Sequence, residues 1–523
     1  MKRKSLVIII ACLLVVGFFT GRFSSVKAEN SSKDLYSYMR LFTEVLTKIN
    51  QYYVEEIDPE ETIFGAIDGM MDTMDPYTTF LTAEEFAELR TSTQGEFGGL
   101  GIHISTALGD YITVMSVIES GPAYYAGLLA GDEIISVDGT STKGWDSDLA
   151  VQRLRGPKNS SVTIKVQREG IEEPLEFEIE RDIVKIEGVP YVYEIKDGIG
   201  YIKITNFNAS VGDDLHAALS ELDAEGLDGV LIDLRFNPGG LLSQAIATVD
   251  EFLPENKLVV YTKGRQEGVE QEFYTRTPYA FNEDIPIIVL INQASASASE
   301  IFAGSLQDWD RALIVGENSF GKGSVQQLFP LSMGHGLKIT TSKYYIKSGR
   351  CIDKGRTRSE QAQKETDNEN DNEKKEVFYT VGGREVYGGG GITPDVIIKQ
   401  DTLNSFEVAV RSKNLFFSFA VNFLANNEIN KDFTLTDKVF HEFLDYIKEH
   451  DIEYTEKELA ESEKWLRNSL GAQIVSNKFG LEEGNKIAVK QDQQLQKALA
   501  LFDQFDTLED MFAYSEGLKA EKQ

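Results

Sequence analysis

The feature that most constrains the fold is an alternation of short apolar segments with helical stretches in the middle of the chain. Starting near Gly198, the apolar segments are rich in isoleucine, valine and leucine and are typical of buried strands. They are residues 200–204, 229–234, 287–291 and 312–315. Because strands that alternate with helices build layered sheets, we expect an α/β domain over about residues 183–400.

The regions before this core have different patterns. Residues 34–92 place apolar side chains at three- and four-residue spacing, as in the stripe Leu41, Val45 and Ile49, and this spacing predicts helices. Asp58-Pro59-Glu60-Glu61 indicates a helix start, with an N-cap, a proline and acidic first-turn residues. Residues 95–182 contain short β-rich runs separated by glycine turns, which predicts a small β-rich domain.

The regions after the strands are helical or polar. Residues 401–523 predict a helical, charged C-terminal extension. We interpret its apolar stripe as a packing face, with a partner site as the alternative; the stripe is Phe440, Phe443, Leu444 and Ile447. Residues 356–375 are polar and charged, and we expect a disordered surface insertion there.

Residues 1–28 are typical of an export signal. Met1–Lys4 is basic, Leu6–Phe19 is apolar, and Val26–Ala28 offers a small-residue cleavage site. An uncleaved membrane anchor is the alternative, although the apolar run is short for a spanning helix. Ile9–Cys12 also resembles a lipoprotein cleavage box, but the apolar run continues past it. We therefore expect an exported protein of the bacterial envelope, periplasmic or anchored on the outer side of the inner membrane.

The charge and the cysteines exclude several classes of protein. The chain has 52 Lys+Arg and 84 Asp+Glu, a net charge of −32, which argues against nucleic acid or an anionic membrane as the main ligand. It has two cysteines, Cys12 and Cys351, and the first lies in the predicted signal. A disulfide framework is therefore excluded.

Ser295-Ala-Ser-Ala-Ser-Glu300 follows an apolar segment that ends at Asn292, and it precedes a predicted helix over Ile301–Leu306. A serine at such a junction has an exposed hydroxyl close to backbone N–H groups that can stabilise an oxyanion. The alternative is that small residues here only allow the helix to pack closely on the sheet.

A serine nucleophile needs a base, and no histidine lies in a triad motif; the five are His103, His216, His335, His441 and His450. A lysine can serve instead, because burial lowers its pKa. The candidate is Lys322 between two glycines, with Gln326 four residues on and predicted to lie on the same face and orient the amine. A phosphate-binding loop at 316–322 is the rejected alternative, because Gly323 stands where that motif needs Ser or Thr.

Two glycine-rich turns supply further candidate N–H groups. Asp233–Gly240 ends an apolar strand and predicts a turn that could complete an oxyanion hole. Gly98–Ile102 precedes a strand, and such a loop beside an open strand edge can bind a chain-terminal carboxylate.

Together these motifs resemble the carboxyl-terminal processing (tail-specific) serine peptidases over about residues 35–399. The resemblance implies a crotonase-like α/β core with an inserted PDZ domain at 95–182, flanked by the helical regions. It implies a Ser–Lys dyad in which Ser297 attacks, Lys322 is the general base and Gln326 supports it. It implies no metal and no cofactor.

The resemblance also assigns backbone and coupling roles. The oxyanion hole would come from N–H groups of Gly239, Gly240 and Ala298. Free, apolar C-terminal tails of substrate proteins would bind the PDZ loop at Gly99, Leu100, Gly101 and Ile102. Arg155 would link the PDZ domain to the core, and the alternative is that it only forms a surface ion pair. A homo-oligomer or an adaptor protein stays open, nucleic acid is not expected as a partner, and the alternative function is an inactive PDZ scaffold.

Overall fold

The computed structural model describes residues 29–119, 121–223, 226–266, 268, 270–277, 281–282, 284–355, 376–505 and 507–520. The predicted export signal and the predicted insertion at 356–375 lie outside these residues. Within the described ranges, no helix combines the length and apolar character needed to cross a membrane. The chain divides into two compact units between Met74 and Asp75.

In the described part of the first unit, residues 29–74, the helices are α2 (Glu29–Tyr52) and α3 (Pro59–Met71). The predicted helix start is confirmed, because the Asp58 carboxylate accepts the Glu60 amide at 2.8 Å and Pro59 occupies the first turn. The predicted stripe Leu41, Val45 and Ile49 lies on α2, but its side chains are 39–55% exposed. The periodicity therefore predicts the helix without predicting a buried core.

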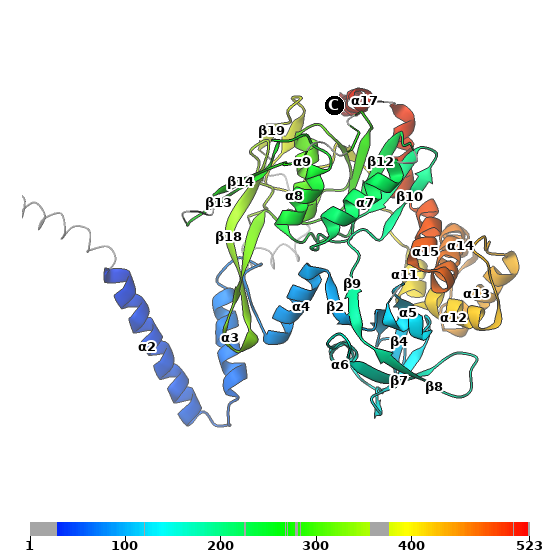
Figure 1. The fold of residues 1–523 in the computed structure, drawn as a ribbon, viewed down its shortest axis with the longest axis horizontal. Coiled ribbons are helices and arrows are strands. Elements are labelled where there is room, and N and C mark those ends of the chain that lie inside the picture. The colour runs from blue at the N-terminus through cyan, green and yellow to red at the C-terminus, as the bar shows by residue number, and fades with distance from the viewer. Residues whose placement is uncertain are drawn as a thin grey trace, which may run out of the picture. The chain divides into compact units, whose positions relative to one another are not determined.

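A six-stranded sheet forms the centre of the second unit (Figure 1). Its order is β10-β11-β12-β15-β16-β21, in which all neighbours are parallel except the antiparallel pair β10–β11. The strands are β10 (Tyr191–Lys196), β11 (Ile199–Lys203), β12 (Gly229–Asp233), β15 (Ile287–Ile291), β16 (Leu313–Gly316) and β21 (Val396–Ile397). The four predicted apolar segments are β11, β12, β15 and β16, within a residue at each end.

Both faces of this sheet are covered, which is why its strands are continuously apolar. Ile232 and Val289 face a core built with α7 (Val211–Asp223), α8 (Leu242–Asp250) and α9 (Ala298–Asp308). Leu231 and Leu290 face the opposite core. That second core contains side chains of α16 (Gln493–Leu501) and α17 (Leu508–Ala520), so the C-terminal extension covers one face of the sheet.

A second sheet has the order β1-β18-β13-β14, with β17 paired to β18. Its strands are β1 (Thr79–Leu81), β13 (Leu258–Gly264), β14 (Gln271–Tyr274), β17 (Ser324–Pro330) and β18 (Gly336–Ile346). Through this sheet the segment that follows Asp75 lies beside β18, because Thr79 pairs with Lys338.

The β-rich domain has its own core around Ile112, Ile134 and Ile164. It is attached through the two-stranded ladder of β2 (Glu96–Gly99) and β9 (Asp182–Lys185), and α4 (Ala83–Gln94) precedes β2. Its other elements are β3 (Ile102–Ser105), β4 (Ile112–Val117), α5 (Pro122–Ala126), β5 (Glu133–Val137), β6 (Thr140–Ser141), α6 (Ser147–Leu154), β7 (Ser161–Gln167) and β8 (Leu175–Glu180).

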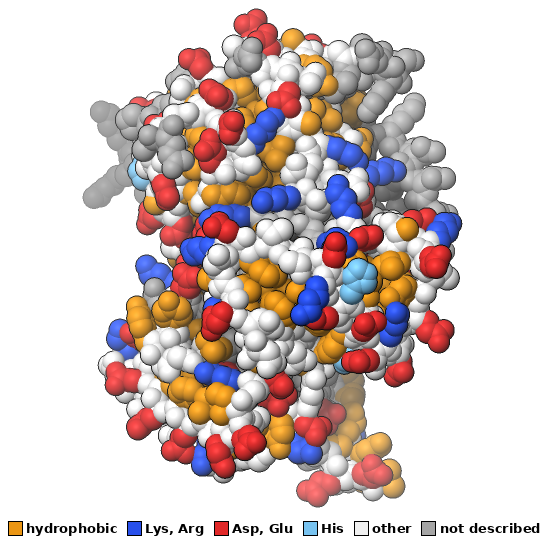
Figure 2. All heavy atoms as spheres, turned by 90° about the vertical axis from the view of Figure 1, so that its right-hand side faces the viewer, with side chains coloured by type: hydrophobic (Ala, Val, Ile, Leu, Met, Phe, Trp, Pro, Cys, Tyr) orange, Lys and Arg blue, Asp and Glu red, His pale blue; other side chains and the backbone are white. Residues whose placement is uncertain are grey.

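Several helices of the C-terminal extension build a separate core in which the predicted stripe Phe440, Phe443, Leu444 and Ile447 is buried. Its interpretation as a packing face is confirmed. These helices are α11 (Ser405–Ser412), α12 (Leu415–Asn426), α13 (Asp437–Glu449) and α14 (Glu456–Phe479). Helix α15 (Leu481–Ala488) follows α14. Figure 2 shows acidic side chains spread over one face of the molecule among lysines and arginines, so the acidic excess is not gathered into one patch there.

Candidate active site

Ser297 lies where β15 passes into α9, as the residue before the first helical turn. Its backbone has φ 57° and ψ −112°, an unusual conformation for a residue with a side chain. Such strained conformations persist only where the surrounding structure enforces them, and they cluster at functional sites. Ser297 is half-buried, so it is partly accessible from outside.

Lys322 lies in the irregular segment before β17. Burial lowers the pKa of its ammonium group and the neighbouring Lys338 lowers it further, while Glu300 and Asp75 oppose the shift. Its Nζ lies 5.0 Å from the centre of the Tyr77 ring. Within the described part of the chain, no hydrogen bond joins Nζ to the Ser297 hydroxyl. The lysine therefore has the lowered pKa that a general base needs, but its Nζ lies over the Tyr77 ring.

One buried carboxylate ties the two residues together. Oε2 of Glu300 accepts the Ser297 amide at 2.8 Å and the Lys322 amide at 2.9 Å. Its Oε1 accepts the Gly321 amide at 2.7 Å and the Ser319 hydroxyl. Burial raises the pKa of Glu300 to about 7, although these four donors favour its ionised form. Glu300 therefore fixes the separation of the predicted nucleophile and base.

Tyr344, on β18, holds the same pair from the other side. Its buried hydroxyl is shared between the carbonyl oxygens of Ser297, at 3.2 Å, and Lys322. Sequence reasoning missed both Glu300 and Tyr344. For Glu300 a signal existed, because a glutamate three residues after a serine at a helix start is a capping-box pattern.

The predicted oxyanion donors differ in whether their amides are already hydrogen-bonded. The amide of Gly239 donates to Asn237 Oδ1 at 2.9 Å, so in this structure it is already hydrogen-bonded. The Phe207 amide donates to the Gly239 oxygen at 2.9 Å, and the Phe207 oxygen accepts the Leu241 amide at 2.8 Å. Because these bonds flank Gly240, its own amide points away from Phe207. Neither that amide nor the Ala298 amide, at the first position of α9, is hydrogen-bonded among the described residues.

Gly239 still shapes this turn. A Cβ atom at this position would lie 2.6 Å from the Ala296 oxygen and 2.8 Å from the Ala298 nitrogen. Only glycine therefore allows the turn to approach the nucleophile segment so closely.

Gln326 does not reach Lys322, contrary to the predicted shared face. Its Nε2 donates to Ser324 Oγ at 2.7 Å and to Thr340 Oγ1 at 3.4 Å. Thr340 in turn donates to Asp75 at 2.9 Å. The face rule fails because Lys322 precedes the strand and the pairing register shifts between residues 325 and 326.

The C-terminal extension reaches the same turn through Arg235. This buried guanidinium binds Asp233 at 2.8 Å and Asp492 at 2.7 Å, and it donates to Gln494 at 3.1 Å. Asp233 ends β12 just before the glycine turn. The extension, to which the sequence assigns no role, thus braces the strand that presents the candidate oxyanion donors.

In the β-rich domain, Gly99 ends β2 and Ile102 begins β3, with Leu100 and Gly101 in the loop between them. The Leu100 oxygen accepts the Ala123 amide at 2.8 Å and the Gly101 oxygen accepts the Ile118 amide at 2.9 Å. The loop is therefore held by its carbonyl groups.

Arg155 caps the end of α6 and lies over Phe97 of β2, with 4.7 Å between the guanidinium carbon and the ring centre. It therefore contacts the strand that attaches the β-rich domain.

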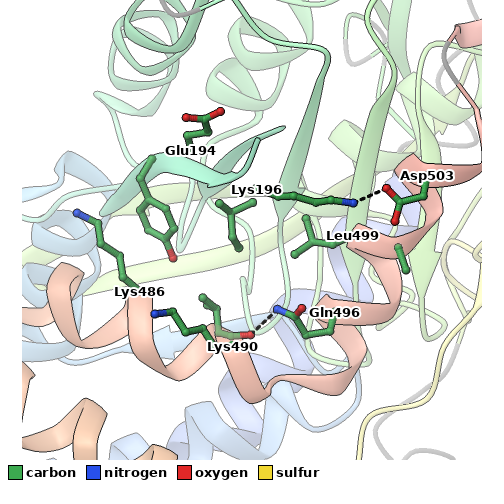
Figure 3. Close-up of a pocket in the computed structure, with 11 residues that line it drawn as sticks. Glu194, Lys196, Lys486, Lys490, Gln496, Leu499 and Asp503 are labelled. Carbon is green, nitrogen blue, oxygen red and sulfur yellow. Dashed lines mark hydrogen bonds and ion pairs between the residues drawn. The ribbon is translucent and has the colours of Figure 1, made fainter. Parts of the chain in front are cut away.

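A cavity of about 630 Å³ lies away from these residues, between β10 and the C-terminal helices (Figure 3). Some of its polar groups are engaged: Lys196 pairs with Asp503, and Gln496 donates to the Val489 oxygen at 2.9 Å. None of the predicted site residues lines it. The described residues also contain no group of three or more His, Cys, Asp and Glu side chains suited to a metal ion.

Comparison with known proteins covers most of the chain. Residues 198–360 match the model of peptidase family S41, residues 113–168 match a PDZ domain, and residues 21–85 match the N-terminal domain of the activating protease CtpB. Residues 408–480 match a family of unknown function.

Three relatives are similar to this chain over more than half its length. A carboxy-terminal-processing protease of Bartonella bacilliformis is 41% identical over 62% of this chain and 74% of its own. A carboxyl-terminal-processing protease of Synechocystis is 38% identical over 56% and 69%, and CtpB of Bacillus subtilis is 36% identical over 58% and 64%. The predicted resemblance is thereby confirmed, and the chain belongs to the carboxy-terminal processing proteases, serine-type peptidases of family S41 with a PDZ domain.

Proposed function

We propose that this chain is an exported endopeptidase that binds free, apolar C-terminal tails of proteins through its PDZ domain and cleaves them with a Ser297–Lys322 dyad. The observation that carries the proposal is the buried carboxylate of Glu300, which binds the amides of both residues through one oxygen. The core would have the crotonase-like fold that the resemblance implies, and export rests on the basic and apolar pattern of residues 1–28.

The reaction is acyl transfer through a covalent intermediate. Lys322, whose pKa burial lowers, takes the proton of Ser297 in its neutral form as the serine oxygen attacks the peptide carbonyl. The amides of Gly240 and Ala298 stabilise the oxyanion. Protonated Lys322 then donates to the leaving amine, and water hydrolyses the acyl-enzyme. For this to occur, Nζ must swing from the Tyr77 ring to the Ser297 hydroxyl.

Labelling with a fluorophosphonate probe tests the proposal, because an activated serine oxygen attacks the phosphorus of such a probe, displaces fluoride and is phosphonylated. We expect mass spectrometry to find the label on Ser297. Absence of labelling under conditions in which a control serine peptidase reacts would favour the alternative of an inactive PDZ scaffold.

The pH dependence of activity tests the lysine. Because Lys322 acts when neutral and its pKa is below the ordinary 10.5, kcat/KM is expected to rise with pH and level off below that value. Lys338→Met removes a neighbouring positive charge that lowers this pKa, so its profile is expected to shift to higher pH. Profiles measured with a quenched fluorogenic peptide check this; an unshifted profile in the variant would contradict it.

Arg155 tests the coupling between the PDZ domain and the core. If its contact with Phe97 transmits tail binding, Arg155→Ala should lower cleavage of a protein with a free apolar C-terminus by about 3- to 10-fold. Tail affinity, measured in full-length Ser297→Ala backgrounds, should stay unchanged. Amidating the substrate's C-terminus should reduce cleavage by the wild type similarly.

The matched control is Arg153→Ala, which removes an exposed arginine from the same helix. Equal cleavage of free and amidated substrates by the wild type and by both variants would show that tail binding and catalysis are not coupled.

A further inference from the structure

One edge of the second sheet begins beside the dyad. The edge strand β17 starts two residues after Lys322, and among the described strands it pairs with β18 alone. Since the amides of Ser297 and Lys322 share one Glu300 oxygen, β17 starts close to the candidate nucleophile as well.

The composition of this edge is unusual. The strand reads Ser-Val-Gln-Gln-Leu-Phe-Pro and carries no charge, whereas 26% of the chain is charged. Leu328 is 39% exposed and Phe329 is 40% exposed. Natural proteins normally protect an exposed edge with charges, because its free N–H and C=O groups pair with other chains. An unprotected edge at this place indicates that it has a partner.

The neighbouring bonds show which backbone groups are free. The Thr340 amide donates to Thr78 Oγ1 at 3.1 Å, on the side away from β17. Thr340 and Gln326 therefore form a pair without mutual backbone bonds, and in an antiparallel ladder such pairs alternate with bonded ones. By this alternation Gln326 and Leu328 direct their N–H and C=O groups to the open edge, and Pro330, without an N–H, ends the ladder.

We propose that the free edge of β17 is the binding site of the substrate chain during cleavage: an extended, unfolded segment adds to β17 as a further strand. The proposal rests on the proposed function. Main-chain pairing provides affinity that depends little on sequence, which suits an enzyme whose selectivity comes from a tail bound elsewhere. The position of the edge, directly after Lys322, favours a substrate over a second copy of the chain.

Leu328→Pro removes the N–H that points to the open edge, and it removes no hydrogen bond to β18. Edge strands tolerate proline at such positions. Leu328→Ala loses the same side chain but keeps the N–H. For a long unstructured peptide we expect kcat/KM of Leu328→Pro to be about tenfold below that of Leu328→Ala. Fluorophosphonate labelling of Ser297, which needs no bound peptide backbone, should differ by less than about twofold between the two variants.

N-methylation of the substrate gives a second measurement that needs no variant. In a series of peptides that each carry one N-methyl group, the wild type should cleave more slowly when the methyl group is on every second residue of the series. The reason is that alternate N–H groups of an added strand face β17.

The outcomes separate the two proposals. Absence of Ser297 labelling in the wild type refutes the proposed function. Normal labelling with equal cleavage by Leu328→Pro and Leu328→Ala refutes the proposed binding of substrate to β17. Effects of N-methylation that do not alternate along the peptide refute it as well. A changed oligomeric state in Leu328→Pro with cleavage equal to Leu328→Ala also refutes it, by assigning the edge to a second copy.

Discussion

Alanine at Ser297 or at Lys322 is expected to abolish peptide hydrolysis, lowering kcat by about 10⁴- to 10⁶-fold. A serine without a base is a poor nucleophile, and a base without the serine has no proton to take. Because both residues serve one step, the double variant should be no slower than the slower single variant. Single-turnover hydrolysis of a quenched peptide measures all three.

Lys343→Ala is the matched control, since Lys343 lies on the neighbouring β18 and is paired with Asp353 at 2.8 Å. It should leave turnover within about twofold, as expected for a half-exposed ion pair. Gln326→Ala should reduce activity less than Lys322→Ala, because Gln326 touches Ser324 and Thr340 and not the lysine. Normal turnover in Lys322→Ala together with loss in His335→Ala would show that the base is a histidine.

The sequence predicts the parts of the fold that are buried on both sides. The predicted segment 287–291 has the same bounds as β15. A fully apolar run between polar turns is stable only as a strand buried on both faces. Strand β18 was not predicted, since GLKITTSKYYI alternates apolar and polar residues only partly. Its pairing with β1 joins residues far apart in sequence, which no local pattern encodes.

The same distinction applies to the site. Residue types and spacing point to a serine within residues 295–299 and to Lys322 between two glycines, and the family resemblance singles out Ser297 among the three serines. The positions of their side chains follow from tertiary contacts: the amide of Gly239 is taken by Asn237, and the ring of Tyr77 lies beside Lys322. Likewise, the role of Asp492 becomes visible only when the C-terminal extension meets Arg235.

Glu300→Gln is expected to lower kcat by about 10²- to 10³-fold although Glu300 need not touch the substrate. In the wild type each carboxylate oxygen accepts two donors. An amide replaces one oxygen with an NH₂ group that faces donors, so two hydrogen bonds to a charged group are lost. At about 1.5–3 kcal/mol each, their loss releases the fixed separation of Ser297 and Lys322.

Glu407→Gln is the matched control, because Glu407 is also buried and forms a capping box with Asn404 at the start of α11. It loses the same kind of local helix contact without any link to the dyad. Peptide hydrolysis by this variant should stay within about twofold of wild type, since only one cap bond is lost. Equal losses of peptide hydrolysis in the two variants would show that Glu300 acts only as a helix cap.

The pH dependence of stability separates positioning from general disruption. Because burial raises the pKa of Glu300 to about 7 from 4.5, the folded state binds a proton more tightly than the unfolded state. This contribution to stability is complete below pH 4.5 and is lost as the pH rises through about 7. Glu300→Gln cannot titrate, so its free energy of unfolding should depend less on pH across that window. If Glu300→Gln retained the wild-type slope, another group would titrate in this window, and the Glu300 carboxylate would stay ionised throughout it.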